Sequence, residues 1–421
     1  MENIVTIEKV VLGGQGLGTL PNGKKVFVWG ALPKEKVLLR IYKTKSSYAE
    51  AITDEVLKES RDRITPEGPE EYVSTSPWQI MNFEAENNTK FRLLCEAFTS
   101  AHLNIKWENF FSDKKRYGYR NKMEYNFWWD NETQRVSLAL HRRGSHQKFM
   151  LAGSVLASDA INNAGRRLIE YMNNQKIEAR SLKSVILRSQ KDGGVGVVLY
   201  AVNRDLSSFD WGSLNFESFT LYYSEPKSPA SVGTELLASY GKKYLEDEIL
   251  SKQFRYSPEG FFQVNLSAYE VALNDMRSWV KTPEVIDMYA GVGSIGMSMP
   301  YRHLISVELD SAANIQALVN AKNNKNIQVI LSESERALQY INGEATLIVD
   351  PPRAGLHRKV IAKITDVSPP LIAYLSCDPA TQARDVAIIL ETGKYEVKFA
   401  RGYNFFPATP HIESLIILKL K

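Results

Sequence analysis

From about residue 260 to the end of the chain, short apolar runs alternate with longer segments of helical spacing. The runs are EVIDMYA, LISVELD, IQVIL, TLIVDPP and LIAYLSC, and the segments between them are SIGMSMP, SAANIQALVNAKN, ERALQYI and HRKVIAKI, with ATQARDVAIILE after the last run. This order predicts a doubly wound parallel sheet. The closing runs YEVKFA and SLIILKL have no helix between them, which predicts an antiparallel edge.

The first 250 residues have a different pattern. Residues 1–58 alternate apolar runs with the turns GGQGLG and PNGKK, which predicts a small antiparallel barrel. Residues 60–77 are typical of a linker, and Phe91, Leu94, Cys95 and Phe98 predict a helix that buries Cys95. Alternating strands from 116 to about 250 predict a β-rich domain. We therefore expect an α/β protein with domains at 1–58, 59–250 and 251–421.

Composition narrows the class of protein. Lys and Arg number 52 against 48 Asp and Glu, a net charge of +4 that permits a nucleic-acid partner without requiring one. Two cysteines cannot build a disulfide framework or a cysteine-only metal site, and the first residues lack the plan of a signal peptide. The longest apolar runs have the length of strands, so we expect a cytoplasmic protein without a membrane span.

Three basic groups are candidates for contact with nucleic acid. One comprises cations of the predicted barrel: Lys24, Lys25, Lys34, Lys36, Arg40, Lys43 and Lys45. The others are YRNK (119–122) and HRRGSHQK (141–148), where aromatic residues and histidine accompany the charge. A solvated surface explains the barrel lysines equally well, whereas the central clusters could hold phosphates and stack bases.

DMYAGVGSIG (287–296) follows a predicted strand and has the spacing G-x-G-x-x-G, with Gly291 and Gly293 in its loop. That spacing alone equally suits a dinucleotide-binding fold, and a structural glycine turn is the plain alternative. Asp287 favours S-adenosylmethionine, because a carboxylate at this strand end can accept hydrogen bonds from an ammonium group. Glu308, at the end of the next strand, could accept both ribose hydroxyls.

VDPPRAGL (349–356) places Asp350 at the end of the fourth strand, on the edge where open sheets bind ligands. A DPPY-type motif would indicate methylation of an exocyclic amine. Here Pro352 is followed by Arg353, so no aromatic platform follows. An ordinary turn would also use aspartate and proline, so this motif is only moderately specific.

Cys377 follows an apolar run within YLSCDPATQARD, where a thiol is placed to act as a nucleophile. A buried structural thiol is the alternative. Asp378 would oppose thiolate formation, so Arg353 or the N-terminus of the next helix should compensate. His411 and Glu413 lie two residues apart, on one face of an extended segment, and a solvated charge is the alternative for Glu413.

These groups fit one reaction. A thiolate that adds to carbon 6 of uracil makes carbon 5 nucleophilic, and a base must later remove the carbon 5 proton. Cys377 and Glu413 suit these two roles. Gln263 or Arg353 could donate to the enolate oxygen. The uracil must leave its stack in the RNA. FFQVN (261–265) offers aromatic side chains that could pack on it and polar side chains that could hydrogen-bond to it.

The ordered motifs GFFQVN, DMYAGVG, VELD, DPPRAGL, YLSCDPATQARD and FFPATPHIES resemble those of the RNA uracil-C5 methyltransferase family. YRNKMEY and HRRGSH resemble its central domain, and residues 1–58 resemble the TRAM barrel of many members. The resemblance implies a class I S-adenosylmethionine domain with Cys377 as nucleophile and Glu413 as proton acceptor. It further implies cofactor contacts from Gln263, Tyr289, Glu308 and Asp350, with Phe261 packed on the uracil. We add Asp287, Gly291 and Gly293 as cofactor residues, and Arg353 and His411 as substrate residues.

The sequence departs from the family pattern at three places. The segments 72–85 and 151–156 lack the cysteines that hold an iron-sulfur cluster in many members, so we expect no cluster and no metal. SCDP replaces SCNP, which is expected to shift the thiol pKa. Asn404 replaces an acid, which is expected to loosen the loop carrying Glu413.

We therefore expect formation of 5-methyluridine in structured RNA by a monomer. We favour 23S ribosomal RNA, because a TRAM barrel resembles the ribosomal members more than the transfer RNA members. The competing hypotheses are a transfer RNA uracil-C5 methyltransferase, an RNA cytosine-C5 methyltransferase, and an inactive RNA-binding paralogue. The cytosine enzymes typically use a second active-site cysteine, for which Cys95 is badly placed.

Overall fold

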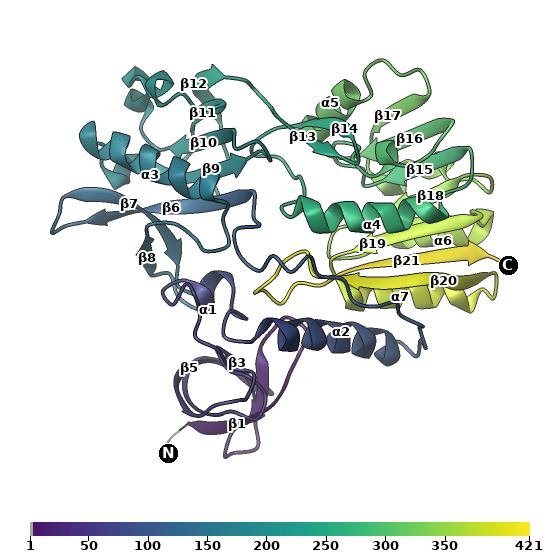
Figure 1. The fold of residues 1–421 in the computed structure, drawn as a ribbon, viewed down its shortest axis with the longest axis horizontal. Helices are drawn as coiled ribbons and strands as arrows, with labels where there is room; N and C mark the ends of the chain where they lie inside the picture. The colour runs from purple at the N-terminus through teal and green to yellow at the C-terminus, as the bar shows by residue number, and fades with distance from the viewer. Residues whose placement is uncertain (1–2) are drawn as a thin grey trace.

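The N-terminal strands close into a barrel in the order β1-β2-β3-β5-β4 (Figure 1). The computed structural model describes residues 3–421, so the first two residues of the predicted barrel domain lie outside the described residues. Side chains alternate between buried and exposed along the strands, and the buried set, including Val5, Val26 and Val28, fills the barrel. The predicted barrel is confirmed, but it is not wholly antiparallel, because β3 pairs with β5 in parallel. Its identity as a TRAM domain stays a prediction. Its strands are β1 (Ile4–Val10), β2 (Gly16–Thr19), β3 (Lys25–Trp29), β4 (Lys36–Thr44) and β5 (Tyr48–Lys58).

Two helices follow the barrel, the short α1 (Tyr72–Thr75) and the long α2 (Phe83–Ser100), which is capped by Asn82. α2 lies between the barrel and the C-terminal sheet (Figure 1) and packs against α7 (Pro379–Glu391). Its buried side includes Glu86 and Lys90, whereas Cys95 is only half-buried. The prediction that Cys95 points into the core was wrong, because the buried stripe runs through Glu86, Lys90, Leu93, Leu94, Ala97 and Phe98 and Cys95 lies beside it.

The central region is a seven-stranded sheet in the order β12-β11-β10-β9-β6-β7-β8. One helix, α3 (Asp159–Asn174), packs against β7, β9 and β10, and the alternating pattern of this region did not predict it. The strands are β6 (Lys122–Asp130), β7 (Arg135–His141), β8 (Lys148–Leu151), β9 (Leu182–Ser189), β10 (Val195–Ala201), β11 (Ser218–Tyr223) and β12 (Glu235–Gly241). Three 3-10 turns complete the region: η1 (Ala179–Ser181), η2 (Arg204–Ser208) and η3 (Trp211–Leu214).

The C-terminal sheet has the order β17-β16-β15-β18-β19-β21-β20. Strands β15 to β19 pair in parallel, and β21 pairs antiparallel with both β19 and β20. The predicted α/β class, parallel sheet and antiparallel edge are confirmed. The strands are β15 (Glu284–Met288), β16 (His303–Glu308), β17 (Ile327–Leu331), β18 (Thr346–Val349), β19 (Leu371–Ser376), β20 (Tyr395–Tyr403) and β21 (Glu413–Leu420). The helices are α4 (Leu266–Trp279), α5 (Ser311–Asn320), α6 (Arg358–Val367) and α7.

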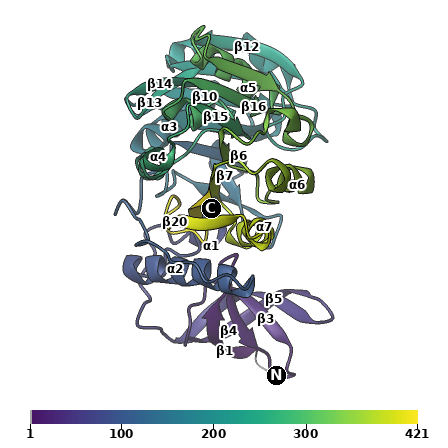
Figure 2. The same ribbon diagram turned by 90° about the vertical axis from the view of Figure 1, so that its right-hand side faces the viewer.

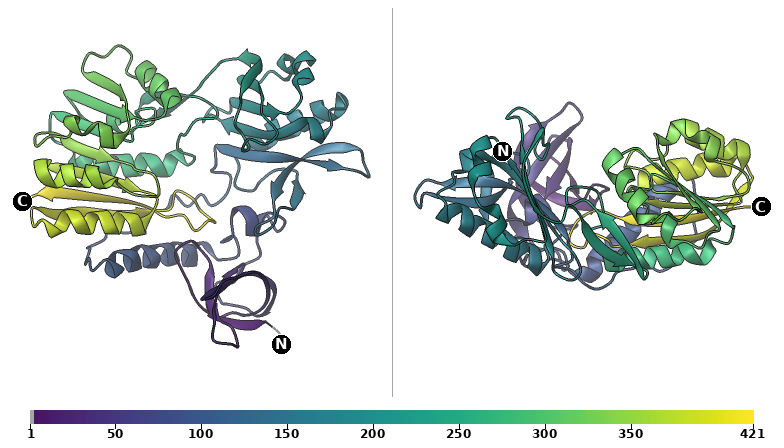
Figure 3. Two further views of the ribbon diagram at one scale, coloured as in Figure 1. Left: turned by 180° about the vertical axis from the view of Figure 1, so that it is seen from behind. Right: turned by 90° about the horizontal axis from the view of Figure 1, so that it is seen from above.

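Helices cover both faces of this sheet (Figure 2). Residues of α2, α6 and α7 share one apolar cluster with alternate residues of the strands, such as Leu347 and Val349. Residues of α4, α5 and the hairpin β13 (Leu245–Ile249) and β14 (Lys252–Tyr256) share the other cluster, which includes Ile348. Views from behind and from above show the central sheet beside the C-terminal one (Figure 3). The predicted three-domain division stays a prediction, and both α2 and the β13–β14 hairpin contribute to the C-terminal core.

Two predicted helices of the C-terminal region are only 3-10 turns. SIGMSMP forms η4 (Gly296–Ser298), because the Gly296 N–H is bonded to the Asp287 carboxylate and Pro300 ends the segment. ERALQYI forms η5 (Ser334–Arg336) and η6 (Leu338–Tyr340), because it is too short for a stable helix before the Asn342–Gly343 turn. Within residues 3–421, no helix is long and apolar enough to cross a membrane.

Candidate active site

The pairing of β19 with β21 brings Cys377 and Glu413 together. Ser376 is the partner of Ser414 in this antiparallel ladder, and Cys377 and Glu413 are the next residues on the two chains. Residues that face each other in such a ladder have Cα atoms about 4.5 to 5.5 Å apart. Cys377 is half-buried and Glu413 is only 3% exposed. The thiol and the carboxylate therefore flank one point at the carboxyl end of β19.

Burial and neighbouring carboxylates keep the Cys377 thiol protonated in the ligand-free protein. Burial has the largest effect, Glu413 and Asp350 add to it, and together they raise the pKa of Cys377 to about 12, while Arg353 acts in the opposite direction. Asp378 has a weaker effect than these groups. Its carboxylate accepts hydrogen bonds from the Ala380 and Thr381 N–H groups, at 3.1 and 3.0 Å, and caps α7. The expected opposition from Asp378 is thus minor, because its charge is directed at the helix N-terminus.

Glu413 and His411 have strongly shifted pKa values in opposite senses. Burial, followed by Asp350, raises the pKa of Glu413 well above its usual range. Burial and then Arg353 lower the pKa of His411 to about 4, so its imidazole is neutral at pH 7. Arg353 Nη2 lies 3.5 Å from His411 Nδ1. The two predicted substrate residues are therefore neighbours, and Arg353 lowers the pKa values of both Cys377 and Glu413.

Three further carboxylates gather at the ends of the parallel strands. Asp287 is buried, and its Oδ2 accepts a bond from the Gly296 N–H at 2.8 Å while its Oδ1 has no partner. Burial, with smaller contributions from Asp350 and Glu308, raises the pKa of Asp287 to about 8. Burial alone raises the pKa of Asp350 to about 7. Such crowded carboxylates favour a cationic ligand, since a positive charge would stabilise their ionised forms.

The loop after β15 has the backbone shape of a ligand cradle. Tyr289 has φ +64°, and Gly291 and Gly293 have φ +56° and +85°. A left-handed conformation is costly for tyrosine, and such strain clusters at binding sites. Glu308 Oε2 accepts a bond from the Gly291 N–H at 2.6 Å, which fixes the loop against the end of β16. All the predicted cofactor residues except Gln263 lie on this loop or at the ends of β15, β16 and β18.

The remaining predicted residues lie in the segment 257–265 between β14 and α4. Phe261 is 72% exposed, whereas Gln263 is buried. The segment is tied to the loop before β21, because Asn265 Nδ2 donates to the Phe405 carbonyl at 3.1 Å. Asn121 and Lys122 of the YRNK cluster also bond to its backbone.

A buried network under the loop before β21 was not predicted. Lys90 donates to Asn404 Oδ1 at 2.6 Å and to the Phe406 carbonyl at 2.9 Å, and it pairs with Glu86 at 3.1 Å. Glu86 in turn accepts bonds from Asn404 Nδ2 at 3.0 Å and the Ala408 N–H at 2.9 Å. These bonds hold the loop, contrary to the loosening expected from Asn404. In the sequence, a glutamate four residues before a lysine is typical of an exposed pair, so no signal indicated the network.

The predicted RNA-facing cations are largely bound within the protein. In the barrel, Lys25 pairs with Glu8, Arg40 with Asp54 and Lys43 with Glu50, at 3.1, 3.1 and 2.7 Å. In HRRGSHQK, Arg143 stacks 4.0 Å from the Trp29 ring centroid and donates to the Ser74 carbonyl at 2.9 Å. Arg143 therefore joins the central sheet to the barrel and α1, and a solvated or structural role explains most of these charges.

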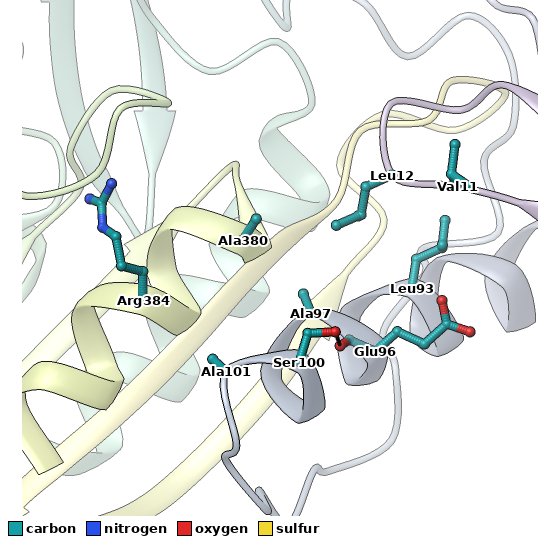
Figure 4. Close-up of a pocket in the computed structure, with 9 residues that line it drawn as sticks. All are labelled: Val11, Leu12, Leu93, Glu96, Ala97, Ser100, Ala101, Ala380 and Arg384. Atoms are coloured by element: carbon teal, nitrogen blue, oxygen red, sulfur yellow. Dashed lines mark hydrogen bonds between the residues drawn. The ribbon is translucent and has the colours of Figure 1, made fainter. Parts of the chain in front are cut away.

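A separate cavity of about 350 Å³ lies between the loop after β1, α2 and the start of α7 (Figure 4). Its lining comprises Val11, Leu12, Leu93, Glu96, Ala97, Ser100, Ala101, Ala380 and Arg384. None of the predicted site residues is among them. This cavity is therefore not the predicted active site.

A family profile described as tRNA (Uracil-5-)-methyltransferase matches residues 244–421. Two relatives, each described as an uncharacterized RNA methyltransferase, align over nearly the whole chain. The protein of Thermotoga maritima is 29% identical, covering 98% of each chain, and that of Caldanaerobacter subterraneus subsp. tengcongensis is 28% identical, covering 99% of this chain and 98% of its own.

Among solved structures, the Pyrococcus abyssi tRNA (uracil-54, C5)-methyltransferase in complex with S-adenosyl-L-homocysteine has the same fold. Its TM-score is 0.77 at 22% identity, with 98% of this chain and 99% of that chain covered. The profile, the full-length relatives and the shared fold agree with the motif series. Residues 244–421 match the uracil-5 methyltransferase profile, and together with the full-length RNA methyltransferase relatives and the shared fold this match supports the S-adenosylmethionine-dependent RNA uracil-C5 methyltransferase family as the family of this chain.

Proposed function

We propose that this protein methylates carbon 5 of a uridine in structured RNA, with Cys377 as nucleophile and Glu413 as proton acceptor. The observation that carries the proposal is the position of these residues in the β19–β21 ladder, one step beyond the Ser376–Ser414 pair. A thiol and a carboxylate on either side of one pyrimidine are what addition at carbon 6 and proton removal at carbon 5 require.

The strand ends fit S-adenosylmethionine as methyl donor. Asp287 has a buried oxygen without a partner, and its neighbours Asp350 and Glu308 are also acidic, which suits a ligand that carries ammonium and sulfonium charges. We assign ligand contacts to these residues and to Tyr289, Gly291, Gly293 and Gln263. When bound, S-adenosylmethionine supplies the electrophilic methyl group. The complex of the Pyrococcus abyssi protein with S-adenosyl-L-homocysteine supports this assignment.

The chain's own groups then carry out the chemistry on uracil. The Cys377 sulfur bonds to carbon 6, and the electron pair of the carbon 5–carbon 6 double bond moves to the ring enolate, which makes carbon 5 nucleophilic. After carbon 5 has been methylated, Glu413 accepts its proton, and the electrons of that C–H bond re-form the double bond and expel the thiolate. The Glu413 carboxylate has a raised pKa and is therefore a strong base once ionised.

Arg353 has two roles in this proposal. It is the one cation among the groups that act on the Cys377 pKa, and it lowers that pKa. It also lies beside His411, and with Gln263 it is a candidate donor to the enolate oxygen. Thiolate formation is expected to occur mainly in the loaded enzyme, where the cationic methyl donor offsets the carboxylates.

For the target RNA, the two candidates have different support. The resemblance of the barrel to TRAM favours 23S ribosomal RNA. The Pyrococcus abyssi protein, which matches along the whole chain, acts by its name on uracil 54 of tRNA, and this favours transfer RNA. We retain ribosomal RNA as the first candidate and transfer RNA as the second. We also propose that the protein acts as a cytoplasmic monomer.

A cytosine-C5 methyltransferase and an inactive paralogue have weaker support. Burial and Glu96 raise the pKa of Cys95, and no charged group of the site acts on it, so it is poorly placed as the second cysteine of a cytosine enzyme. Asp378 caps α7, so the change from SCNP to SCDP has a structural role and need not indicate an inactive paralogue.

The test is incubation of the protein with labelled S-adenosylmethionine and with ribosomal and transfer RNA from a strain that lacks its gene. We expect label in 5-methyluridine, and none with Cys377→Ala. Wild-type protein should also form a covalent complex with RNA that carries 5-fluorouridine at the target. Label in 5-methylcytidine, full activity of Cys377→Ala, or tight RNA binding without label would refute the proposal.

A further inference from the structure

The segment 257–265, which carries Phe261 and Gln263, has no regular secondary structure, yet side chains of the central sheet hold its backbone. Arg188 of β9 is fully buried, and its Nη1 and Nη2 donate to the carbonyls of Gly260 and Phe262 at 2.7 and 2.6 Å. Lys122 of β6 donates to the carbonyls of Glu259 and Gly260 at 2.5 and 3.1 Å. Two cations from neighbouring strands thus hold three carbonyls of one loop.

Asn121 extends this contact toward Gln263. Its Nδ2 donates to the Gln263 carbonyl at 3.0 Å, and its backbone N–H donates to the Val264 carbonyl at 3.2 Å. The set of held carbonyls comprises those of Glu259, Gly260, Phe262, Gln263 and Val264. With the backbone fixed on this side, the Phe261 side chain remains 72% exposed.

Phe262, which follows the exposed Phe261 in the chain, is itself packed in the interior. Phe262 stacks on Tyr256, with ring centroids 4.1 Å apart and planes at 13°. The Arg188 guanidinium lies 4.7 Å from the Tyr256 centroid, and the Tyr256 hydroxyl donates to Asp247 at 2.5 Å. A buried arginine is costly unless its donors are satisfied. Here main-chain oxygens satisfy Nη1 and Nη2 and the Tyr256 ring faces the guanidinium, whereas Nε has no hydrogen-bond partner.

We propose that Asn121, Lys122 and Arg188 form a carbonyl clamp that positions Phe261 and Gln263 for the target uridine. This inference rests on the proposed function, and it makes the three residues positioning residues. Cation-to-carbonyl bonds are stronger than neutral ones, and they are already made without RNA, so the loop is preorganised. The central sheet therefore acts on catalysis through the protein backbone, although its YRNK motif suggested phosphate contacts.

The clamp and a phosphate contact predict different salt dependences. A lysine that neutralises a phosphate adds about 0.9 to the slope of log affinity against log salt concentration, and its loss removes that amount. Lys122 is bound to carbonyls, so Lys122→Met should leave the slope unchanged while it lowers the rate of methylation.

The test compares Lys122→Met with a matched control, Lys183→Met. Lys183 is a half-buried lysine of β9 that likewise donates to carbonyls, those of Glu225 and Ser228 at 2.6 and 2.8 Å, in another loop. We expect kcat/KM for RNA to fall about ten- to a hundredfold in Lys122→Met, since small misplacements at a reacting site have effects of that size. Lys183→Met should change it less than about twofold, a limit set by ordinary surface substitutions. Amide hydrogen exchange in 259–265 should rise only in Lys122→Met.

Combining Lys122→Met with Phe261→Ala shows whether the clamp acts through the Phe261 ring. In Phe261→Ala, Lys122→Met should have little further effect, because coupled residues are not additive. Arg188→Met leaves the Phe262 carbonyl without its donor and the Gly260 carbonyl with Lys122 alone. If this variant fails to fold, Asn121→Ala provides the second comparison. Equal kinetics for Lys122→Met and Lys183→Met, a slope lowered by about 0.9, or a full additional loss in Phe261→Ala would overturn the clamp. Wild-type protein without methylation would refute the proposed function instead, and hydrogen exchange would still test the clamp.

Discussion

Two regions of the molecule differ in whether their charged side chains are compensated by other groups of the protein. These regions are the carboxyl ends of the C-terminal strands and the basic segments of the barrel and central sheet. At the strand ends, Asp350 raises the pKa values of Asp287, Glu413 and Cys377, and Arg353 opposes the shifts of Glu413 and Cys377. In the basic segments, cations such as Lys43 and Arg143 are bound to carboxylates, carbonyls or aromatic rings. Charge that the folded chain leaves uncompensated indicates a ligand, whereas charge that it compensates indicates architecture.

The largest expected effect on activity comes from a change at the strand ends, where the carboxylates are not compensated. Glu413→Gln keeps the shape of the side chain but removes the proton acceptor, so turnover should fall about 10²- to 10⁴-fold. Addition of Cys377 to the ring does not need this base, so a covalent RNA complex should accumulate. Gel electrophoresis of denatured enzyme with labelled RNA would detect it.

Ser414→Ala is the control for this prediction, because Ser414 pairs with Ser376 one step farther along the ladder. It should retain turnover within about tenfold, since it loses one neutral hydrogen bond to Gln382. Full activity of Glu413→Gln would show that another group accepts the proton.

The same contrast explains what could be predicted from the sequence. Strand ends were predictable, because apolar runs fix the strands and parallel strands present their carboxyl ends at one edge, where Cys377 and Asp350 lie. The partners of Lys90 and Arg188 were not, because a buried cation and a solvated one look alike in sequence, and their acceptors are remote or belong to the backbone. The distance in sequence between Glu86 and Asn404 hides the network in the same way.

Asn404→Asp tests whether the compensated network tolerates the family's usual acid. Asn404 donates to Glu86 Oε1 and Asn87 Oδ1, and a carboxylate would place two acceptors against them. We expect the free energy of unfolding to fall by about 2 to 4 kcal/mol, because two buried bonds are lost and like charges meet. Urea denaturation measures it. Glu86→Gln in the same chain should restore part of the loss, and an unchanged midpoint for Asn404→Asp would contradict the role of the network.

The pH dependence of stability in Asp287→Asn tests whether the Asp287 carboxyl at the strand ends is uncompensated. The pKa of Asp287 is raised by burial to about 8 in the folded protein, and Asp350 and Glu308 are the charged groups that act on it. Between its unfolded pKa and about 8, the folded state holds a proton that the unfolded state has released, so stability falls as pH rises. The asparagine removes this term and can still accept the Gly296 bond. Between pH 5 and 8, the ligand-free variant should lose less stability than wild type by more than about 1 kcal/mol.

Denaturation midpoints at pH 5, 6, 7 and 8, with exposed Asp54→Asn as control, measure this difference. If the midpoints of Asp287→Asn and wild type changed with pH in the same way, the pKa of Asp287 would not be raised in the folded protein. Binding of S-adenosylmethionine should weaken in Asp287→Asn, because the variant lacks the negative charge that suits a cationic ligand.

The smallest expected effect concerns the barrel lysines. Lys43 is held by Glu50 at 2.7 Å, whereas Lys45 has no ion-pair partner in the part of the chain that the structure describes. If the barrel contacts RNA, Lys45→Ala should lower the salt slope of RNA affinity by about 0.9, as expected for one phosphate contact. Lys43→Ala should lower it less, since Lys43 must first leave Glu50. Filter binding at several salt concentrations measures both slopes. Equal losses would show that an exposed ion pair, worth only about 0.2 to 1 kcal/mol, does not withhold a cation from RNA.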